Sequence, residues 1–341
     1  MVTAGQPTTA ALGSSIEPLD QRYDLAMLDL DGVVYVGPEA VPGAPEHVAT
    51  ARRAGMRVAF ITNNASRPPE AVAEHLRELG VEAGPEDVVT SAQAAARVLA
   101  DRLGAGGRVV VLGGRGLAEA VAAEGLEQVG VEDEADAVVT GYGPEVLWGQ
   151  IMRTAVRIRD GLWWVASNTD LTFPTTFGTA PGHGVLVETL RRFTGVEPVV
   201  AGKPSRPLLD ETVRRCGGER PLMVGDRLDT DIEGAHVAGV DSLLVLTGVT
   251  GLAELVAAGP ELRPTYVSAD LAGLDSVHHA PELSEDAVSL GGWQGRVDGG
   301  ELVVSGQGEV DDWWRVVAVT AWRHLDDTGQ PVGTDGVALP G

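Results

Sequence analysis

MLDLDGVV, residues 27–34, is the stretch that decides the fold of this chain. The apolar run 25–28 predicts a strand, and Asp29 and Asp31 follow at its end, with Gly32 turning the chain away. Side chains two residues apart on an extended chain point the same way. Both carboxylates are therefore expected to face one small volume at the carboxyl edge of a parallel sheet, where open α/β folds bind ligands. Their mutual repulsion favours one proton or one divalent cation between them.

Short apolar runs alternate with amphipathic segments along residues 23–246, and this alternation is typical of βαβ units with a parallel sheet. A loop rich in Thr, Pro and Gly, residues 168–184, interrupts the alternation, and such a long loop is usually functional or disordered. We predict strands at 25–28, 57–62, 108–112, 137–140, 163–167, 222–224 and 242–246, and helices at 44–54, 68–79, 91–103, 117–123, 145–160, 185–193, 208–216 and 232–238.

These elements predict an α/β fold in which a Rossmann-like parallel sheet core carries an inserted α/β cap domain and a small C-terminal α+β module. Residues 1–19, rich in Ser, Thr, Gly, Pro and Ala, are expected to form a disordered arm. In the appended module, residues 303–304, 310 and 316–320 resemble short β-strands. The predicted boundaries are 20–90 and 198–275 for the core, 91–197 for the cap, and 284–341 for the module.

Composition excludes several functional classes. The 341 residues carry a formal net charge of −24, which argues against non-specific binding to nucleic acid or to an anionic membrane. A phosphorylated substrate would therefore need local attraction, such as bound Mg²⁺ and a lysine. The single cysteine, Cys216, excludes a disulfide within the chain and fits a reducing cytoplasm. No apolar stretch approaches the roughly 20 residues that a membrane span needs.

Polar residues of other kinds follow further strands of the predicted core. Thr62 and Asn63 end one strand, Lys203 lies in a Gly-Lys-Pro turn, and Asp226 and Asp231 follow the strand 222–224. Taken singly, these have ordinary explanations as a helix cap, a surface turn and helix-start charges. In this order, at strand ends of one α/β domain, they predict a site for phosphate and a divalent cation.

With these motifs in this order, residues 23–275 resemble the haloacid dehalogenase superfamily. The insertion between Thr62 and Lys203 resembles the subclass with a large α/β cap, which implies a phosphoric monoester hydrolase that uses Mg²⁺ and dimerises through its cap. Within this subclass the chain is most similar to the actinobacterial glycerol-3-phosphate phosphatases. The stretches that carry this similarity are residues 62–67, 89–93, 201–204 and 225–234, with Trp293-Gln294 and Asp311-Asp312 in the C-terminal extension.

The resemblance implies a role for each motif residue. Asp29 would attack phosphorus and form an aspartyl-phosphate, while Asp31 would protonate the leaving alkoxide and later take a proton from water. The second aspartate also implies an alkoxide leaving group, since true dehalogenases lack it. Mg²⁺ would be held by Asp29, the backbone carbonyl of Asp31 and Asp226, with Asp231 as a partner of metal-bound waters or of Lys203.

Thr62, the backbone N–H of Asn63, and Lys203 would bind the phosphoryl oxygens. Asp170 and Phe173, in the loop 168–184 of the cap, are the candidates for choosing the organic part of a small phosphorylated metabolite. Glycerol 3-phosphate is the first expectation, and phosphoglycolate, a sugar phosphate or a nucleotide are the alternatives of the same chemistry. A regulatory protein without catalysis, acting through its C-terminal module, is the alternative from another class.

Overall fold

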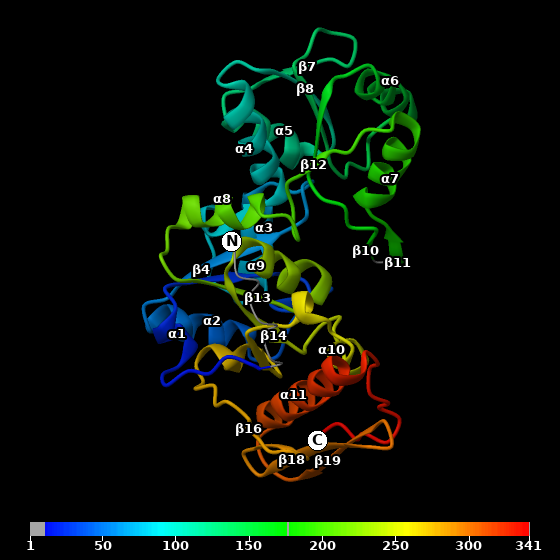
Figure 1. Ribbon diagram of the computed structural model, residues 1–341. Helices are drawn as coiled ribbons and strands as arrows, with labels where there is room; N and C mark the ends of the chain where they lie inside the picture. Colours follow the sequence, from blue (N-terminus) through cyan, green and yellow to red (C-terminus); the bar gives the residue numbers. More distant parts are fainter. Residues whose placement is uncertain (1–10, 176, 341) are drawn as a thin grey trace, which may run out of the picture. The chain divides into compact units, whose positions relative to one another are not determined.

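The computed structural model describes residues 11–175 and 177–340, which form two compact units (Figure 1). The first unit contains the described residues up to Val36, Ala40–Arg57 and those from Glu219 onward. The second contains Gly37–Glu39 and Val58–Gly218. This division follows the density of contacts, and the predicted cap boundaries at 91 and 197 stay a prediction.

The first unit is built on parallel strands in the order β15-β14-β13-β1. Leu28 of β1 lies opposite Val224 of β13, so the residues that follow both strands emerge at one edge. All four residues of β1 are buried, as expected for a central parallel strand. The strands are β1 (Leu25–Leu28), β13 (Pro221–Gly225), β14 (Asp241–Val245) and β15 (Tyr266–Ser268), and the helices and helical turns are α1 (Leu19–Arg22), α2 (Ala44–Arg53), η2 (Leu228–Ile232), α9 (Glu233–Ala238), α10 (Leu252–Val256), η3 (Pro260–Leu262) and η4 (Leu271–Leu274).

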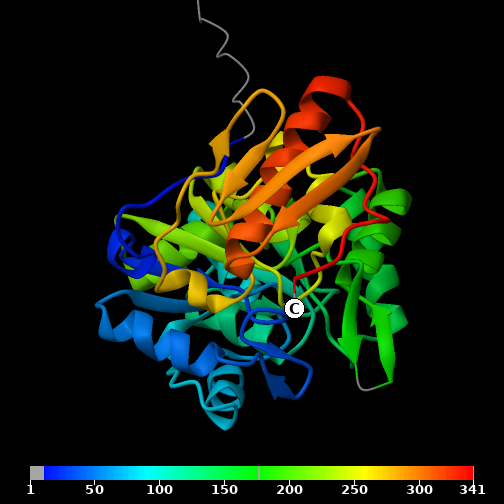
Figure 2. The same cartoon turned by 90° about the horizontal axis from the view of Figure 1, so that it is seen from below.

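The C-terminal module of this unit is an antiparallel sheet with one long helix, α11 (Val310–Thr328), along it (Figure 2). The prediction of β-like structure holds for residues 303–304, which lie in β19, but was wrong for residue 310, which begins α11, and for residues 316–320, which lie in its middle. Val316–Thr320 are all buried, so packing of the helix overrides the strand preference of this β-branched run. The strands are β16 (Glu282–Leu283), β17 (Val288–Leu290), β18 (Trp293–Asp298) and β19 (Glu301–Gly306).

A parallel sheet in the order β12-β9-β8-β6-β7 dominates the second unit. Helices α6 and α7 lie together on one side of it, and α4 and α5 lie together on the other (Figure 1). Its strands are β6 (Arg108–Leu112), β7 (Glu127–Val129), β8 (Ala137–Thr140), β9 (Trp163–Ala166) and β12 (Val199–Val200), and its helices are α4 (Ser91–Leu103), α5 (Arg115–Ala123), α6 (Trp148–Arg159) and α7 (His183–Thr194). The unit also contains α3 (Pro69–Glu78), η1 (Pro85–Asp87), β5 (Val88–Thr90), α8 (Pro207–Cys216) and most of β4 (Arg57–Thr62), while the short strands β2 (Tyr35–Val36) and β3 (Glu39–Ala40) follow β1 in the chain.

The predicted long loop contains regular structure. Strands β10 (Thr172–Thr175) and β11 (Gly178–Pro181) pair as an antiparallel hairpin, and α7 begins at His183, two residues before the expected start. The residues of β11 are all exposed or half-buried, so no alternation of apolar side chains announces the hairpin in the sequence.

The described part of the expected arm, residues 11–19, is ordered, which corrects the prediction there. Leu12 and Ser15 are buried, and the N–H groups of Gly13 and Ser15 donate to the carbonyl oxygens of Thr265 and His278. Two polar backbone contacts and a buried leucine thus fix a segment whose composition alone predicts disorder. Residues 1–10 of the predicted arm lie outside the described residues.

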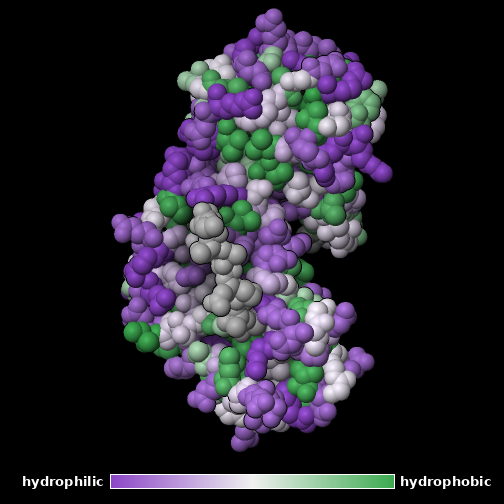
Figure 3. All heavy atoms as spheres, in the orientation of Figure 1, coloured by the Kyte–Doolittle hydropathy of each residue, from purple (hydrophilic) through white to green (hydrophobic). Residues whose placement is uncertain are grey.

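Hydrophilic side chains cover most of the face in Figure 3, as expected for a chain with a net charge of −24. Among the described residues, none of the helices combines the length and the apolar character needed to cross a membrane.

Candidate active site

Three aspartates of the first unit meet at the carboxyl edge of its parallel strands. Asp29 follows β1, Asp226 follows β13, and Asp231 lies in η2; one carboxylate oxygen from each lies within 4.8 Å of the others. Asp226 and Asp231 are fully buried, and Asp29 is partly buried. Three carboxylates at this spacing repel one another strongly unless a cation lies among them. An all-carboxylate donor set of this kind fits Mg²⁺, which prefers oxygen ligands.

Backbone groups and glycines position the carboxylate of Asp226. The N–H of Val249 donates to Asp226 Oδ2 at 2.6 Å, and the N–H of Thr250 donates to the Asp226 carbonyl at 3.1 Å. A Cβ atom on Gly32 or on Gly248 would overlap this carboxylate. Gly32 also has φ +84°, so it both turns the chain after β1 and leaves room for Asp226.

Asp231 is placed by a π-helical turn, η2, of the kind often found at functional sites. The N–H of Arg227 donates to Asp231 Oδ2 at 3.1 Å, and a Cβ on Gly225 would overlap the Asp231 carboxylate. The structure therefore brings Asp231, expected only as a partner of waters or of Lys203, into the carboxylate cluster itself. The nearby Asp229 instead forms an ion pair with Arg227 at 2.8 Å.

Asp31 stands apart from the three clustered carboxylates. Its side chain is exposed, and its backbone forms an isolated bridge with Tyr35. An exposed carboxyl group can exchange protons with water, which suits the predicted acid and base role. The predicted contact of its carbonyl with Mg²⁺ remains a prediction.

Asn63 connects three segments of the second unit. Its Oδ1 accepts from the Lys203 N–H at 2.8 Å, and its Nδ2 donates to the Lys203 carbonyl and to Asp170 Oδ1, each at 3.0 Å. Thr62, which ends β4, accepts from the Asn64 N–H at 3.1 Å, and both Thr62 and Lys203 are buried. Asn63 therefore fixes the backbone of Lys203 on both sides, while phosphate binding by Thr62, Asn63 and Lys203 stays a prediction.

Two side chains that were not predicted as site residues hold the carbonyl of Asn63. Ser91 Oγ donates to this carbonyl at 2.5 Å, and Asn168 Nδ2 donates to it at 2.7 Å. Helix α4 is instead capped by Thr90, whose Oγ1 accepts from the Gln93 N–H at 3.3 Å.

His183, the first residue of α7, holds the backbone of Asn168. Its Nδ1 lies 2.9 Å from the carbonyl oxygen of Asn168, and Asn168 Oδ1 accepts from the Asp170 N–H at 3.2 Å. Burial lowers the pKa of His183 to about 4, so at neutral pH the ring is uncharged and its Nδ1–H donates to the carbonyl. Among the described residues, no group forms a hydrogen bond with His183 Nε2. His183 therefore acts on the loop through Asn168.

Phe173 lies on β10 of the hairpin, where its ring meets the ring of Tyr142 edge to face with centroids 4.8 Å apart. Asp170 precedes the hairpin and contacts Asn63. The two predicted specificity residues thus lie on one ordered segment, and their contact with substrate stays a prediction.

Comparison with known proteins supports the same chemistry. The family described as haloacid dehalogenase-like hydrolase matches residues 26–141, and a related HAD-hydrolase-like family matches residues 200–274. The chain is 46% identical over 298 residues to a D-glycerol 3-phosphate phosphatase of Mycobacterium tuberculosis, covering 87% of this chain and 82% of the relative. It is also 34% identical to an acid sugar phosphatase of Staphylococcus saprophyticus, covering 74% of this chain and 96% of that one.

Solved structures give the same result. A glycerol phosphate phosphatase of Mycobacterium tuberculosis in complex with magnesium superposes with a TM-score of 0.83 at 42% identity, covering 94% of this chain and 95% of that one. A 4-nitrophenylphosphatase of Thermotoga maritima superposes with a TM-score of 0.70 at 31% identity, covering 75% of this chain and 98% of that one. The predicted fold class is therefore confirmed, and the chain belongs to the haloacid dehalogenase-like hydrolases.

Proposed function

We propose that the protein is a Mg²⁺-dependent phosphatase of small phosphate monoesters and that glycerol 3-phosphate is its principal substrate. The observation that carries the proposal is the cluster of Asp29, Asp226 and Asp231, which offers three carboxylate oxygens to one cation. The similarity to glycerol phosphate phosphatases over nearly the whole chain supports the choice of substrate.

The proposed reaction has two steps on the chain's own residues. Asp29 attacks phosphorus, the bond from phosphorus to the ester oxygen breaks, and Asp31 gives its proton to the leaving alkoxide. Asp31 then takes a proton from water, which attacks the aspartyl-phosphate and releases phosphate and free Asp29. Bound Mg²⁺ supplies positive charge that offsets the repulsion between carboxylate and phosphate. Thr62, Lys203 and the N–H of Asn63 hold the phosphoryl oxygens in both steps.

Asp170 and Phe173 would recognise the organic part of the substrate. Glycerol 3-phosphate offers two hydroxyl groups. Both can donate hydrogen bonds to one carboxylate, and each such bond is worth about 1 kcal/mol. Sugar phosphates are the second candidate class, because a 34% identical relative is an acid sugar phosphatase.

Phosphate release from a panel of esters tests the proposal. The panel contains glycerol 3-phosphate, phosphoglycolate, sugar phosphates and nucleotides, each assayed with Mg²⁺ and with EDTA. We expect release that depends on Mg²⁺ and is fastest for glycerol 3-phosphate. Faster release from a sugar phosphate would keep the mechanism and change the substrate, and no release from any ester by folded protein would reject the phosphatase.

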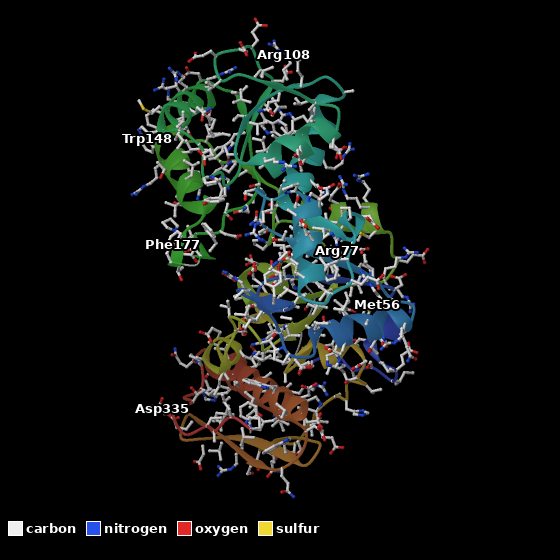
Figure 4. All side chains as sticks on the ribbon, turned by 180° about the vertical axis from the view of Figure 1, so that it is seen from behind. Met56, Arg77, Arg108, Trp148, Phe177 and Asp335 are labelled. Atoms are coloured by element: carbon white, nitrogen blue, oxygen red, sulfur yellow. The ribbon has the colours of Figure 1, made fainter. Side chains whose placement is uncertain are left out.

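We further propose that the protein forms a homodimer through α6. Trp148, Met152 and Val156 lie four residues apart on this helix and are 65%, 56% and 40% exposed, and Leu147 precedes them at 67%. Figure 4 shows Trp148 on the outer side of the helix. An exposed apolar stripe of this kind is typical of an interaction surface. Light scattering should give twice the chain mass for the wild type and the monomer mass for Met152→Glu; a monomeric wild type would contradict this.

The cytoplasm is the compartment that we propose. Cys216 is the single cysteine, so no disulfide can form within the chain, which fits a reducing compartment. The formal net charge of −24 argues against binding to an anionic membrane or to nucleic acid. Fractionation of cells should place the protein with the cytosolic markers.

A further inference from the structure

The N-terminal part of helix α11 is anchored to the first unit's parallel sheet. Asp311, in its first turn, accepts from Ser268 Oγ at 2.8 Å and from the Ala269 N–H at 2.7 Å. The guanidinium of Arg315, 4% exposed, donates to the carbonyl of Val267 at 3.2 Å. The helix is thus fixed to β15 and to the residues that follow it, in addition to covering the module's own sheet.

A first connection runs from α11 to the loop that holds Asp226. Trp322 is fully buried, and its Nε1–H donates to the carbonyl of Leu255 in α10 at 2.8 Å. Helix α10 begins at Leu252, two residues after Thr250, and the N–H groups of Val249 and Thr250 bind Asp226. The position of α10 therefore sets the position of these two donors.

A second connection runs from α11 to the turn that holds Asp231. Asp326 accepts two hydrogen bonds from the Arg263 guanidinium, at 2.6 and 2.9 Å. Arg263 directly follows η3, and η3 packs against both η2 and α9. Leu228 and Ile232 of η2 also lie in the same hydrophobic core cluster as the tryptophans of α11. Asp231 lies between these two core residues in the chain.

We propose that α11 is a positioning element of the cation site, with Trp322 and Asp326 as its positioning residues. Trp322 fixes the loop that orients Asp226, and Asp326 fixes the turns that orient Asp231. Neither residue belongs to the carboxylate cluster, so both act through the backbone segments that they hold. The inference rests on the proposed function only for the identity of the cation as Mg²⁺.

Binding of Mg²⁺ to the full-length protein without substrate, measured by titration calorimetry, tests the proposal. Trp322→Phe keeps an aromatic ring but removes the N–H donor. We expect the dissociation constant for Mg²⁺ to rise about three- to tenfold, below the 10- to 100-fold found for groups that bind a metal ligand directly. Asp326→Asn should raise the dissociation constant for Mg²⁺ about twofold, since this substitution weakens one ion pair and leaves the helix in place.

Each variant has a matched control on the same module. Trp293→Phe removes the same kind of donor, but the Trp293 Nε1–H binds the carbonyl of Glu309 within the module. Asp327→Asn removes a charge one residue from Asp326 on the exposed side of α11. Both controls should bind Mg²⁺ as the wild type does.

Wild-type affinity in folded Trp322→Phe and Asp326→Asn would overturn the proposal, as would equal weakening in the controls. If Trp322→Phe does not fold, as judged by circular dichroism, the comparison of Mg²⁺ affinity between Asp326→Asn and Asp327→Asn tests the proposal by itself. A wild type that binds Mg²⁺ but hydrolyses no ester would reject the proposed function while leaving this comparison valid.

Discussion

At the scale of single residues, the proposed roles of Asp29 and Asp31 predict different dependences of activity on the leaving group of the ester. Asp29 belongs to the carboxylate cluster, whereas Asp31 is exposed and lies outside it. A nucleophile is needed for every ester, but an acid is needed only when the leaving group is a poor one. The leaving group of the substrate can therefore separate the two roles.

Asp31→Asn should lower kcat/KM for glycerol 3-phosphate, which reports the steps up to departure of the alkoxide, about 100-fold or more, because the alkoxide then leaves without a proton. The kcat/KM for 4-nitrophenyl phosphate should fall much less, since nitrophenolate is a stable leaving group; the hydrolysis of the aspartyl-phosphate, for which Asp31 is the base, is common to both esters and does not enter this comparison. Steady-state kinetics with both esters check this difference. An equal loss for both esters would mean that Asp31 is not the general acid.

Asn63→Ala should lower both activity and stability. It removes the side chain that binds the N–H and the carbonyl of Lys203, which leaves two buried backbone groups without these partners. We expect a loss of about 2–3 kcal/mol in the free energy of unfolding and at least a tenfold loss in kcat/KM. Urea denaturation and kinetics measure the two effects.

Asn64→Ala is the matched control for this prediction. Asn64 Oδ1 accepts from the N–H groups of Ser66 and Arg67 at the exposed start of the following segment. The control should lose about 1 kcal/mol of stability and keep its activity. An Asn63→Ala variant with wild-type kinetics would show that Lys203 does not depend on this asparagine.

The sequence predicts the residues at strand ends better than the residues that hold them. Asp29, Thr62 and Asp226 follow apolar runs that are visible along the chain, so their place at a sheet edge can be derived. Contacts such as Ser91 or Asn168 with the carbonyl of Asn63 join residues 28 and 105 positions apart. No local pattern specifies such pairs, because folding alone brings them together.

At the scale of elements, apolar periodicity identifies helices and strands where one face is buried and fails where it is not. The strands Arg57–Thr62, Arg108–Leu112 and Ala137–Thr140 begin and end where the sequence predicts. Strand β11 of the hairpin has no buried residue, so the sequence gives no periodic signal for it. The middle of α11 is buried on all sides, so its β-branched run resembles a strand.

His183, the first residue of α7, should make stability depend on pH. Burial lowers its pKa to about 4, so between pH 6.5 and 4 the unfolded chain binds a proton that the folded chain excludes. The free energy of unfolding therefore falls as the pH drops through this window. The loss due to His183 should be about 2–3 kcal/mol at pH 4.5.

His183→Asn keeps a donor for the Asn168 carbonyl and removes the titrating ring. Urea denaturation at pH 7 and pH 4.5 should show a smaller loss in this variant than in the wild type. His278, whose pKa is also lowered to about 4 by burial, is present in both proteins and cancels in the comparison. An equal loss in both proteins would contradict the assigned role of His183.

At the scale of the whole molecule, the C-terminal module is part of a core and not an independent appendage. Trp313, Val317 and Trp322 of α11 are at most 2% exposed and share one hydrophobic cluster with Leu244 and Val267 of the parallel strands. Burial of each such side chain contributes about 2–3 kcal/mol, and a domain has only about 5–15 kcal/mol of net stability.

Deletion of residues 284–341 should therefore yield protein that aggregates or lacks a cooperative unfolding transition. Circular dichroism and light scattering on the truncated chain measure this. A soluble, cooperatively folded truncation would contradict the prediction, and altered turnover in it would favour a regulatory module.

The most direct test of the central claim is phosphate release from glycerol 3-phosphate by the wild type and by Asp29→Asn, each with Mg²⁺ and with EDTA. We predict release by the wild type with Mg²⁺ alone, and a loss of about 1,000-fold or more in a folded Asp29→Asn protein, because no nucleophile remains. Release by Asp29→Asn at the wild-type rate, or undiminished release in EDTA, would contradict catalysis by an aspartate nucleophile with a bound cation.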